Sequence, residues 1–232
     1  MLIDNLLILM TNNMISNINQ LYFFNIETEE KHYISIRDEF TFNLSQNNLA
    51  YTKLEDCKEK GILLCACKKY IKNQKNGILL IYFNSGNNFD KISEIEKKFY
   101  RTGSFEVYCF CFISIYEQEV KDEILNKNFI KNESNYFFVG GFEVGKSKGV
   151  IKLYELIYNN TKKQIEIECI DNDIFYKNLI KKPISCIIQR KNSLDILATS
   201  WDGEIYLFNL NEKSFLFLKN KEHNKKNFFL KH

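Results

Sequence analysis

Residues Asn135–Leu156, NYFFVGGFEVGKSKGVIKLYEL, decide which of two folds this chain adopts. Inside this stretch, Gly140–Ser147 (GGFEVGKS) matches the phosphate-loop pattern G-x-x-x-x-G-K-[ST] at every fixed position. A phosphate loop needs a buried parallel strand before its glycines and a helix that begins at its lysine, Lys146 in this chain. The competing interpretation is a glycine-containing turn that joins two strands, so the residues after Lys146 decide the fold.

Those residues favour a strand. Lys148 is followed by a glycine and two β-branched residues, Gly149–Ile151, which would fall in the first turn of the required helix and weaken it. Asp171 could serve as the second, metal-binding motif of a nucleotidase, but it follows a run that is typical of another strand. We therefore expect no cofactor, and keep a phosphate-loop nucleotide-binding protein, through Gly140–Ser147, as a remote alternative.

The pattern around this stretch occurs four times along the chain. Each copy has an apolar strand, a polar turn and a second strand whose sixth position is aromatic; the four aromatic residues are Phe24, Tyr82, Tyr154 and Phe208. A third strand is expected after each pair, at His32–Ile36, Phe89–Ile95, Lys163–Ile170 and Ser214–Lys219. Three copies also have a preceding strand, at Phe40–Leu44, Phe105–Phe112 and Ile184–Arg190. Short runs of β-branched and aromatic residues between Gly, Asn and Asp are strand signals.

Four-stranded units that repeat at this scale predict an all-β, β-propeller-like fold of about four blades. Because four blades are few for a closed ring, an incomplete ring is one alternative. The units cover about residues 4–38, 39–99, 104–171 and 183–220, and a basic tail follows at 221–232. The first unit lacks a recognisable inner strand, so our hypothesis is that Asn224–His232 or a partner closes an otherwise incomplete ring. One segment, Gln118–Phe129, has helical periodicity and is interpreted as an insertion.

The fourth unit carries a family resemblance. The stretch Leu194–Leu210, LDILATSWDGEIYLFNL, resembles a blade of the WD-repeat family, with an Asp-Gly turn between two strands. The resemblance implies that Asp202 is the turn aspartate, whose carboxylate can bond backbone amides, and that Gly203 takes a positive φ. Gly77 and Gly149 hold the corresponding position in the second and third units. The family's Trp-Asp pair is replaced by Phe208-Asn209, and its Gly-His pair is absent.

This resemblance implies a non-catalytic scaffold for protein–protein interaction within a larger assembly. Candidate interface residues lie in the exposed turns: Trp201, Phe142 and Lys146. For Trp201 two interpretations are equally supported, an exposed interface anchor and a side chain packed between adjacent blades. The alternative is an enzyme: Gly61–Asn84 is similar to the start of the WD-repeat diphthine methylesterase of diphthamide biosynthesis, although no catalytic residue can be assigned.

Composition limits the other classes. Hydrophobic residues make up 45% and charged residues 26% of the 232-residue chain, as in ordinary globular proteins, and the net charge of +3 gives no reason to expect nucleic acid as a direct partner. No apolar run is long enough to span a membrane. Cys65-x-Cys67 and Cys109-x-Cys111 have the wrong spacing for a zinc site, so we expect no metal and free thiols. The cysteines indicate a reducing compartment, the cytoplasm or nucleus.

Overall fold

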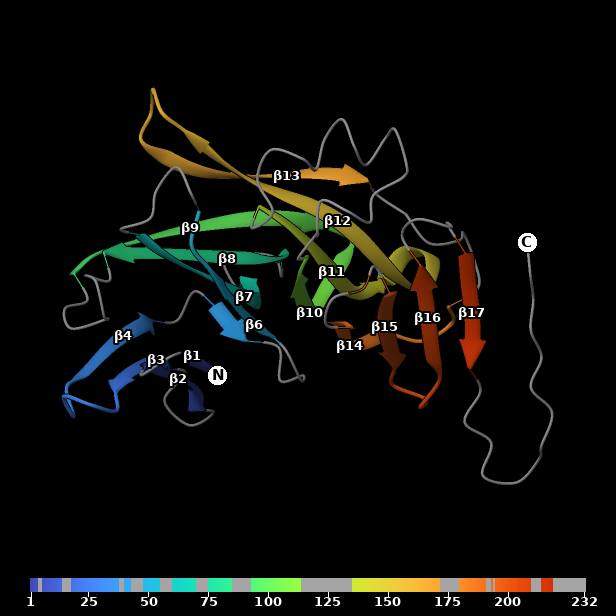
Figure 1. Ribbon diagram of the computed structural model, residues 1–232, viewed down its shortest axis with the longest axis horizontal. Coiled ribbons are helices and arrows are strands. Elements are labelled where there is room, and N and C mark those ends of the chain that lie inside the picture. Colours follow the sequence, from blue (N-terminus) through green and yellow to red (C-terminus); the bar gives the residue numbers. More distant parts are fainter. Residues whose placement is uncertain are drawn as a thin grey trace. The chain divides into compact units, whose positions relative to one another are not determined.

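The computed structural model describes residues 1–3, 6–13, 18–37, 40–42, 48–54, 60–69, 75–84, 93–113, 135–171, 180–190, 193, 195–209 and 214–218. Within these residues the chain is all-β, apart from one short 3-10 turn, and its strands form four antiparallel sheets (Figure 1). No helix in the described ranges has the length and apolarity that crossing a bilayer requires. The helix expected at Gln118–Phe129 and the tail Asn224–His232 lie outside the described residues.

Each sheet is built from strands that follow one another in the sequence. The first has the order β1 (Leu2–Ile3), β2 (Leu6–Asn13), β3 (Ile18–Asn25) and β4 (Lys31–Arg37). The second has β5 (Phe40–Phe42), β7 (Lys60–Lys69), β8 (Lys75–Asn84) and β9 (Ser93–Gly103), with β6 (Leu49–Thr52) also paired to β7. The third has β10 (Phe105–Phe112), β11 (Tyr136–Glu143), β12 (Lys148–Asn159) and β13 (Gln164–Asp171). The fourth has β14 (Ile184–Gln189), β15 (Asp195–Ser200), β16 (Ile205–Asn209) and β17 (Ser214–Leu218).

This strand order is that of propeller blades, so the predicted all-β, β-propeller-like class is confirmed. The four aromatic residues that defined the repeat, Phe24, Tyr82, Tyr154 and Phe208, all fall in the third strand of their sheets. The chain separates into two compact units. Unit 1 holds the first two sheets and ends at Val107, and unit 2 holds the strands from Tyr108 onward, including the rest of β10.

Three strand predictions need correction. The first sheet does have a fourth strand, β1, which pairs with the start of β2 and is only two residues long. The last strand of the second sheet is β9, at Ser93–Gly103 instead of Phe89–Ile95. The preceding strand of that sheet comes in two pieces: Phe42 of β5 pairs with Cys67, and Leu49 of β6 pairs with Cys65. Between them, the backbone N–H of Ala66 donates to the carbonyl of Asn48 at 3.0 Å.

Each unit has its own hydrophobic core between its two sheets. In unit 1 the buried side chains come from β2, β3, β5, β7 and β8, and include Leu21, Phe23, Leu79 and Phe83. The rings of Phe23 and Phe83 meet edge to face with centroids 5.2 Å apart, which joins the first sheet to the second. Apolar burial and such aromatic pairs stabilise sheet-on-sheet packing.

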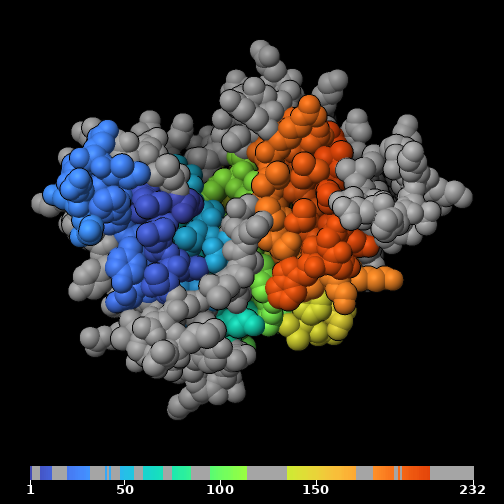
Figure 2. Space-filling model, turned by 90° about the horizontal axis from the view of Figure 1, so that it is seen from below, coloured from blue at the N-terminus to red at the C-terminus, as the bar shows by residue number. Residues whose placement is uncertain are grey.

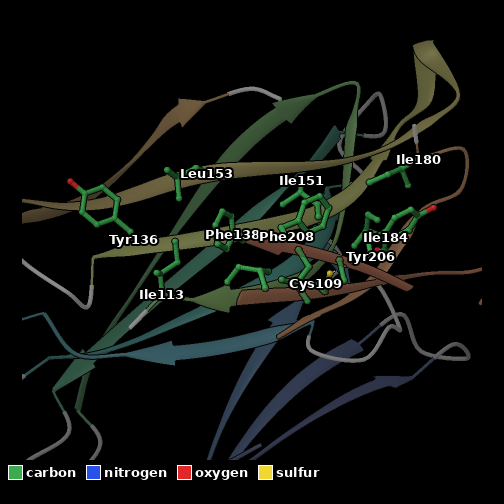
Figure 3. Packing of buried hydrophobic residues seen from close by; sticks show 13 residues of the cluster. Cys109, Ile113, Tyr136, Phe138, Ile151, Leu153, Ile180, Ile184, Tyr206 and Phe208 are labelled. Carbon is green, nitrogen blue, oxygen red and sulfur yellow. Dashed lines mark hydrogen bonds between the residues drawn. The ribbon is translucent and has the colours of Figure 1, made fainter. Parts of the chain in front are cut away.

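The core of unit 2 joins the third sheet to the fourth. Figure 3 shows Phe138 and Ile151 of the third sheet in one cluster with Tyr206 and Phe208 of the fourth. Burial alternates along β15 and β16, since strand side chains point to opposite faces in turn. The cluster therefore covers one face of the fourth sheet, and the β15–β16 turn at residues 201–203 is exposed.

Candidate interaction surface

The turn between β15 and β16 is built around Ser200 and Gly203. The Gly203 N–H donates to the Ser200 carbonyl at 3.0 Å, and the Ser200 N–H donates to the Glu204 carbonyl at 3.0 Å. Gly203 has a φ of +78°, a conformation that costs glycine little, as the sequence led us to expect. The Asp202 carboxylate accepts a hydrogen bond from the Ser200 hydroxyl. The aspartate thus holds this turn through a side chain, and not through the backbone amides that the family resemblance implied.

Trp201 lies in this turn. It has features of both interpretations that the sequence left open, the exposed anchor and the packed side chain. Its side chain is 59% exposed, the most exposed large apolar side chain among the described residues. Its ring also contacts the ring of Tyr108 in β10, with centroids 4.8 Å apart and planes at 58°. One face of the indole is therefore supported by the neighbouring sheet of unit 2, and the rest is open to solvent.

A short segment, Ile180–Pro183, connects this turn to the third sheet. At one end the Gly149 N–H donates to the Ile180 carbonyl at 2.9 Å, and at the other the Trp201 N–H donates to the Pro183 carbonyl at 3.0 Å. Between the two bonds, Lys181 and Lys182 are exposed. The segment therefore presents two cations between the start of β12 and Trp201.

The stretch that matches the phosphate-loop pattern is the end of β11 and the turn of a hairpin. β11 and β12 pair antiparallel over eight residue pairs, from Tyr136 opposite Glu155 to Glu143 opposite Lys148. A 3-10 turn, η2 (Val144–Lys146), joins them, and Ser147 takes a left-handed conformation with φ at 50°. Since Lys148–Asn159 is a strand and not a helix, the stretch lacks the helix N-terminus that a phosphate requires. Gly140–Ser147 is therefore not a phosphate loop, and the nucleotide-binding alternative loses the feature on which it rested.

The other residues proposed in this hairpin have ordinary structural contacts. The Lys146 ammonium is 3.3 Å from the Glu143 carboxylate, and its side chain is 65% exposed, so it points into solvent at the tip of the turn. Val144 beside it is also exposed. Phe142 lies in β11, half-buried and opposite Gly149. Lys146 therefore lies at the exposed tip, while Phe142 belongs to the sheet.

Two glycines that were predicted in turns lie inside strands. Gly149 is the second residue of β12, where a Cβ would be 2.2 Å from the Lys182 carbonyl oxygen. Gly77 is the third residue of β8, at a register shift, where a Cβ would be 2.2 Å from the Tyr100 carbonyl oxygen. Glycine is needed at both positions because another backbone passes close by, and not because of a positive φ.

The four cysteines of the two Cys-x-Cys motifs are free thiols in strands; Cys111 is partly buried and the other three are buried. Cys65 and Cys67 lie in β7, and Cys109 and Cys111 lie in β10. Burial raises the pKa of Cys67 to about 12 and that of Cys111 to about 11, so these thiols stay protonated at neutral pH. In the part of the chain that the structure describes, no cluster of three metal-ligating side chains occurs.

The sequence did not identify Lys181 and Lys182 as part of a site. No local motif marks them. Their position beside Trp201 depends on two backbone hydrogen bonds to different sheets, which leave no trace in the residue types. Figure 2 shows yellow atoms of the third sheet against orange atoms of the fourth.

No model of a known protein family matches the sequence, and no curated protein matches it. Among solved structures, the chain is similar to the β-propeller domain of Cps50 (Swd1) from Myceliophteria thermophila, with 9% sequence identity and a TM-score of 0.27. The alignment covers 97% of this chain and 66% of that one, slightly less than two thirds of its length. The fold assignment therefore rests on strand order and register: the chain is an all-β protein of antiparallel, blade-like sheets.

Proposed function

We propose that the protein is a non-catalytic interaction scaffold of the WD-repeat type that works within a larger assembly in the cytoplasm or nucleus. The observation that carries this proposal is Trp201, 59% exposed and supported from behind by Tyr108. Tryptophan held rigidly at a surface is the residue type that most often dominates protein–protein binding energy. Turns on a rigid β-scaffold are also where binding residues concentrate.

Three features of the fourth sheet support a preformed site. The backbone N–H of Trp201 is bonded to Pro183, and Gly203 and Asp202 both bond to Ser200 within the same turn. Tyr206 donates to the Glu204 carboxylate at 2.5 Å, which fixes the far end of the turn. A turn fixed in this way loses little conformational entropy when a partner binds.

The test is purification of the tagged full-length chain from its native cells, with stoichiometry measured for each co-purifying protein. We expect Trp201→Ala to remove a stoichiometric partner while the melting temperature changes by only a few degrees. Ile188→Ala is the matched control, because Ile188 is a 47% exposed apolar residue of the same unit. Trp201→Phe keeps an aromatic contact with Tyr108 and should retain part of the binding.

The outcomes separate recognition from packing. A large loss of stability in Trp201→Ala, with binding restored at temperatures where the variant is folded, would assign the side chain to packing. An assembly that survives Trp201→Ala in the folded variant would contradict the proposal that this residue is the anchor.

A further inference from the structure

We propose that the partner contributes an extended segment in which an apolar side chain contacts Trp201 and carboxylates on one side of it contact Lys181 and Lys182. The Trp201 surface is defined as these three residues. This inference rests on the interaction role proposed above and specifies the chemistry of the partner.

The apolar position follows from the way Trp201 is held. Its ring is supported by Tyr108 at 4.8 Å between centroids, and its backbone is bonded to Pro183 at 3.0 Å, so the exposed indole face has a fixed position. An aliphatic or aromatic side chain of the partner gains most by covering this exposed indole face.

The acidic position follows from the Ile180–Pro183 segment. Consecutive Cα atoms are about 3.8 Å apart, so the Cα atoms of Lys181 and Lys182 lie within about 8 Å of that of Pro183, whose carbonyl bonds to Trp201. Both lysines are exposed, and both ends of the segment are fixed by backbone bonds. The two cations therefore have fixed attachment points close to the Trp201 backbone.

The described carboxylates of the β11–β12 and β15–β16 turns each have a polar partner. Glu143 pairs with Lys146, Asp202 accepts from Ser200, and Glu204 accepts from Tyr206. Among the ion pairs between described residues none involves Lys181 or Lys182, so both can offer their charge to an incoming group, and the complementary group on a protein is a carboxylate.

The negative charge of Asp202 favours a peptide over a nucleic acid as the partner. This carboxylate is exposed and directly follows Trp201 in the chain, so the lysines and the aspartate give the surface two signs of charge. A nucleic acid carries a uniform row of phosphates, which the aspartate would repel. A peptide with acidic residues on only one side of its apolar residue avoids this repulsion, so the observations favour a protein segment.

The experiment is selection of a random peptide-display library on the immobilised full-length protein. Wild type is expected to enrich peptides with Asp or Glu on one side of an aliphatic or aromatic residue. Lys181→Glu/Lys182→Glu should instead enrich Lys and Arg at those positions. Lys162→Glu/Lys163→Glu is the control, because it makes the same charge change at another exposed lysine pair, in the β12–β13 turn, and should leave the selection unchanged.

The best peptide is then synthesised with a fluorescent label and its affinity is measured by anisotropy. Removing the charges of Lys181 and Lys182 is expected to raise the dissociation constant of the peptide about 3–30-fold, as for the loss of two exposed ion pairs. Trp201→Ala should weaken it about 30-fold or more, as for a hot-spot residue. A labelled single-stranded oligonucleotide serves as the competing probe and should bind more weakly.

The outcomes distinguish this inference from the proposed function. Peptides that need Trp201 but show no acidic bias would overturn the partner chemistry and leave the interaction role standing. Failure to select any Trp201-dependent peptide, or tighter binding of the oligonucleotide through the same lysines, would also overturn the inference. If folded Trp201→Ala retains every partner, the proposed function fails with it.

Discussion

Gly140 sets the distance between the two sheets of unit 2. A Cβ at this position would lie 2.6 Å from Ile184 Cγ2 and 2.7 Å from both Cys109 Sγ and Ile187 Cδ1, closer than carbon atoms pack. The match to a nucleotide-binding motif was therefore misleading at this residue: the glycine makes room for side chains of the facing sheet. Its role is packing in the core that Figure 3 shows.

We predict that Gly140→Ala lowers the free energy of unfolding by about 1–3 kcal/mol, because the added methyl group overpacks a filled core. Urea unfolding followed by tryptophan fluorescence measures this change. Gly145→Ala is the matched control in the same hairpin, since a Cβ there has no neighbour within 4 Å, and it should change stability by no more than about 0.5 kcal/mol. Equal effects of the two substitutions would show that Gly140 does not lie at a close contact.

Among the elements, the β15–β16 turn was predicted in most detail. Gly203 has the positive φ that the sequence indicated, +78°, and nothing lies within 4 Å of its missing Cβ. We therefore expect Gly203→Val to lower the free energy of unfolding by about 1–3 kcal/mol through backbone strain alone. Gly203→Asn should cost less, because Asn tolerates the left-handed region. Thermal unfolding of both variants measures this, and an equal loss in the two would contradict backbone strain as the cause.

Strand predictions succeeded where apolar runs were long and bounded by turn residues. The third and fourth sheets follow the predicted strands to within a few residues, from β10 to β17. The prediction failed for β1, because two residues are too few to show alternation, and for β6, because Leu49–Thr52 contains no distinctive signal. β9 was placed too early because its charged residues resemble a loop. In the structure it pairs with β8 along most of its length.

The candidate site was only half predictable for a related reason. Trp201, Asp202 and Gly203 are neighbours in the sequence, so a single turn motif identified them together. Lys181 and Lys182 join them through backbone bonds to two different sheets. Residue types specify which strands form, but the contacts between sheets depend on packing that a single sequence does not display.

On the scale of the whole molecule, the described residues form two units with separate cores. The cluster of unit 1 includes Leu79, the cluster of unit 2 includes Ile187, and the two clusters share no residue. Sheets that bury their apolar faces against each other within one unit give that unit its own source of stability. A substitution in one core is therefore expected to lower local stability mainly on its own side of the unit boundary, which lies between Val107 and Tyr108.

This expectation is tested by hydrogen–deuterium exchange on two core variants. Ile187→Ala should cost about 2–5 kcal/mol, since it leaves a cavity in a packed core, and should speed amide exchange mainly in β11–β17. Leu79→Ala should have the same cost and speed exchange mainly in β2–β9. Each variant is the control for the other, because Ile187 and Leu79 are both buried aliphatic residues with 1% exposure. If either substitution speeds exchange equally in both groups of strands, the chain unfolds as one cooperative body, and the two cores are not separate sources of stability.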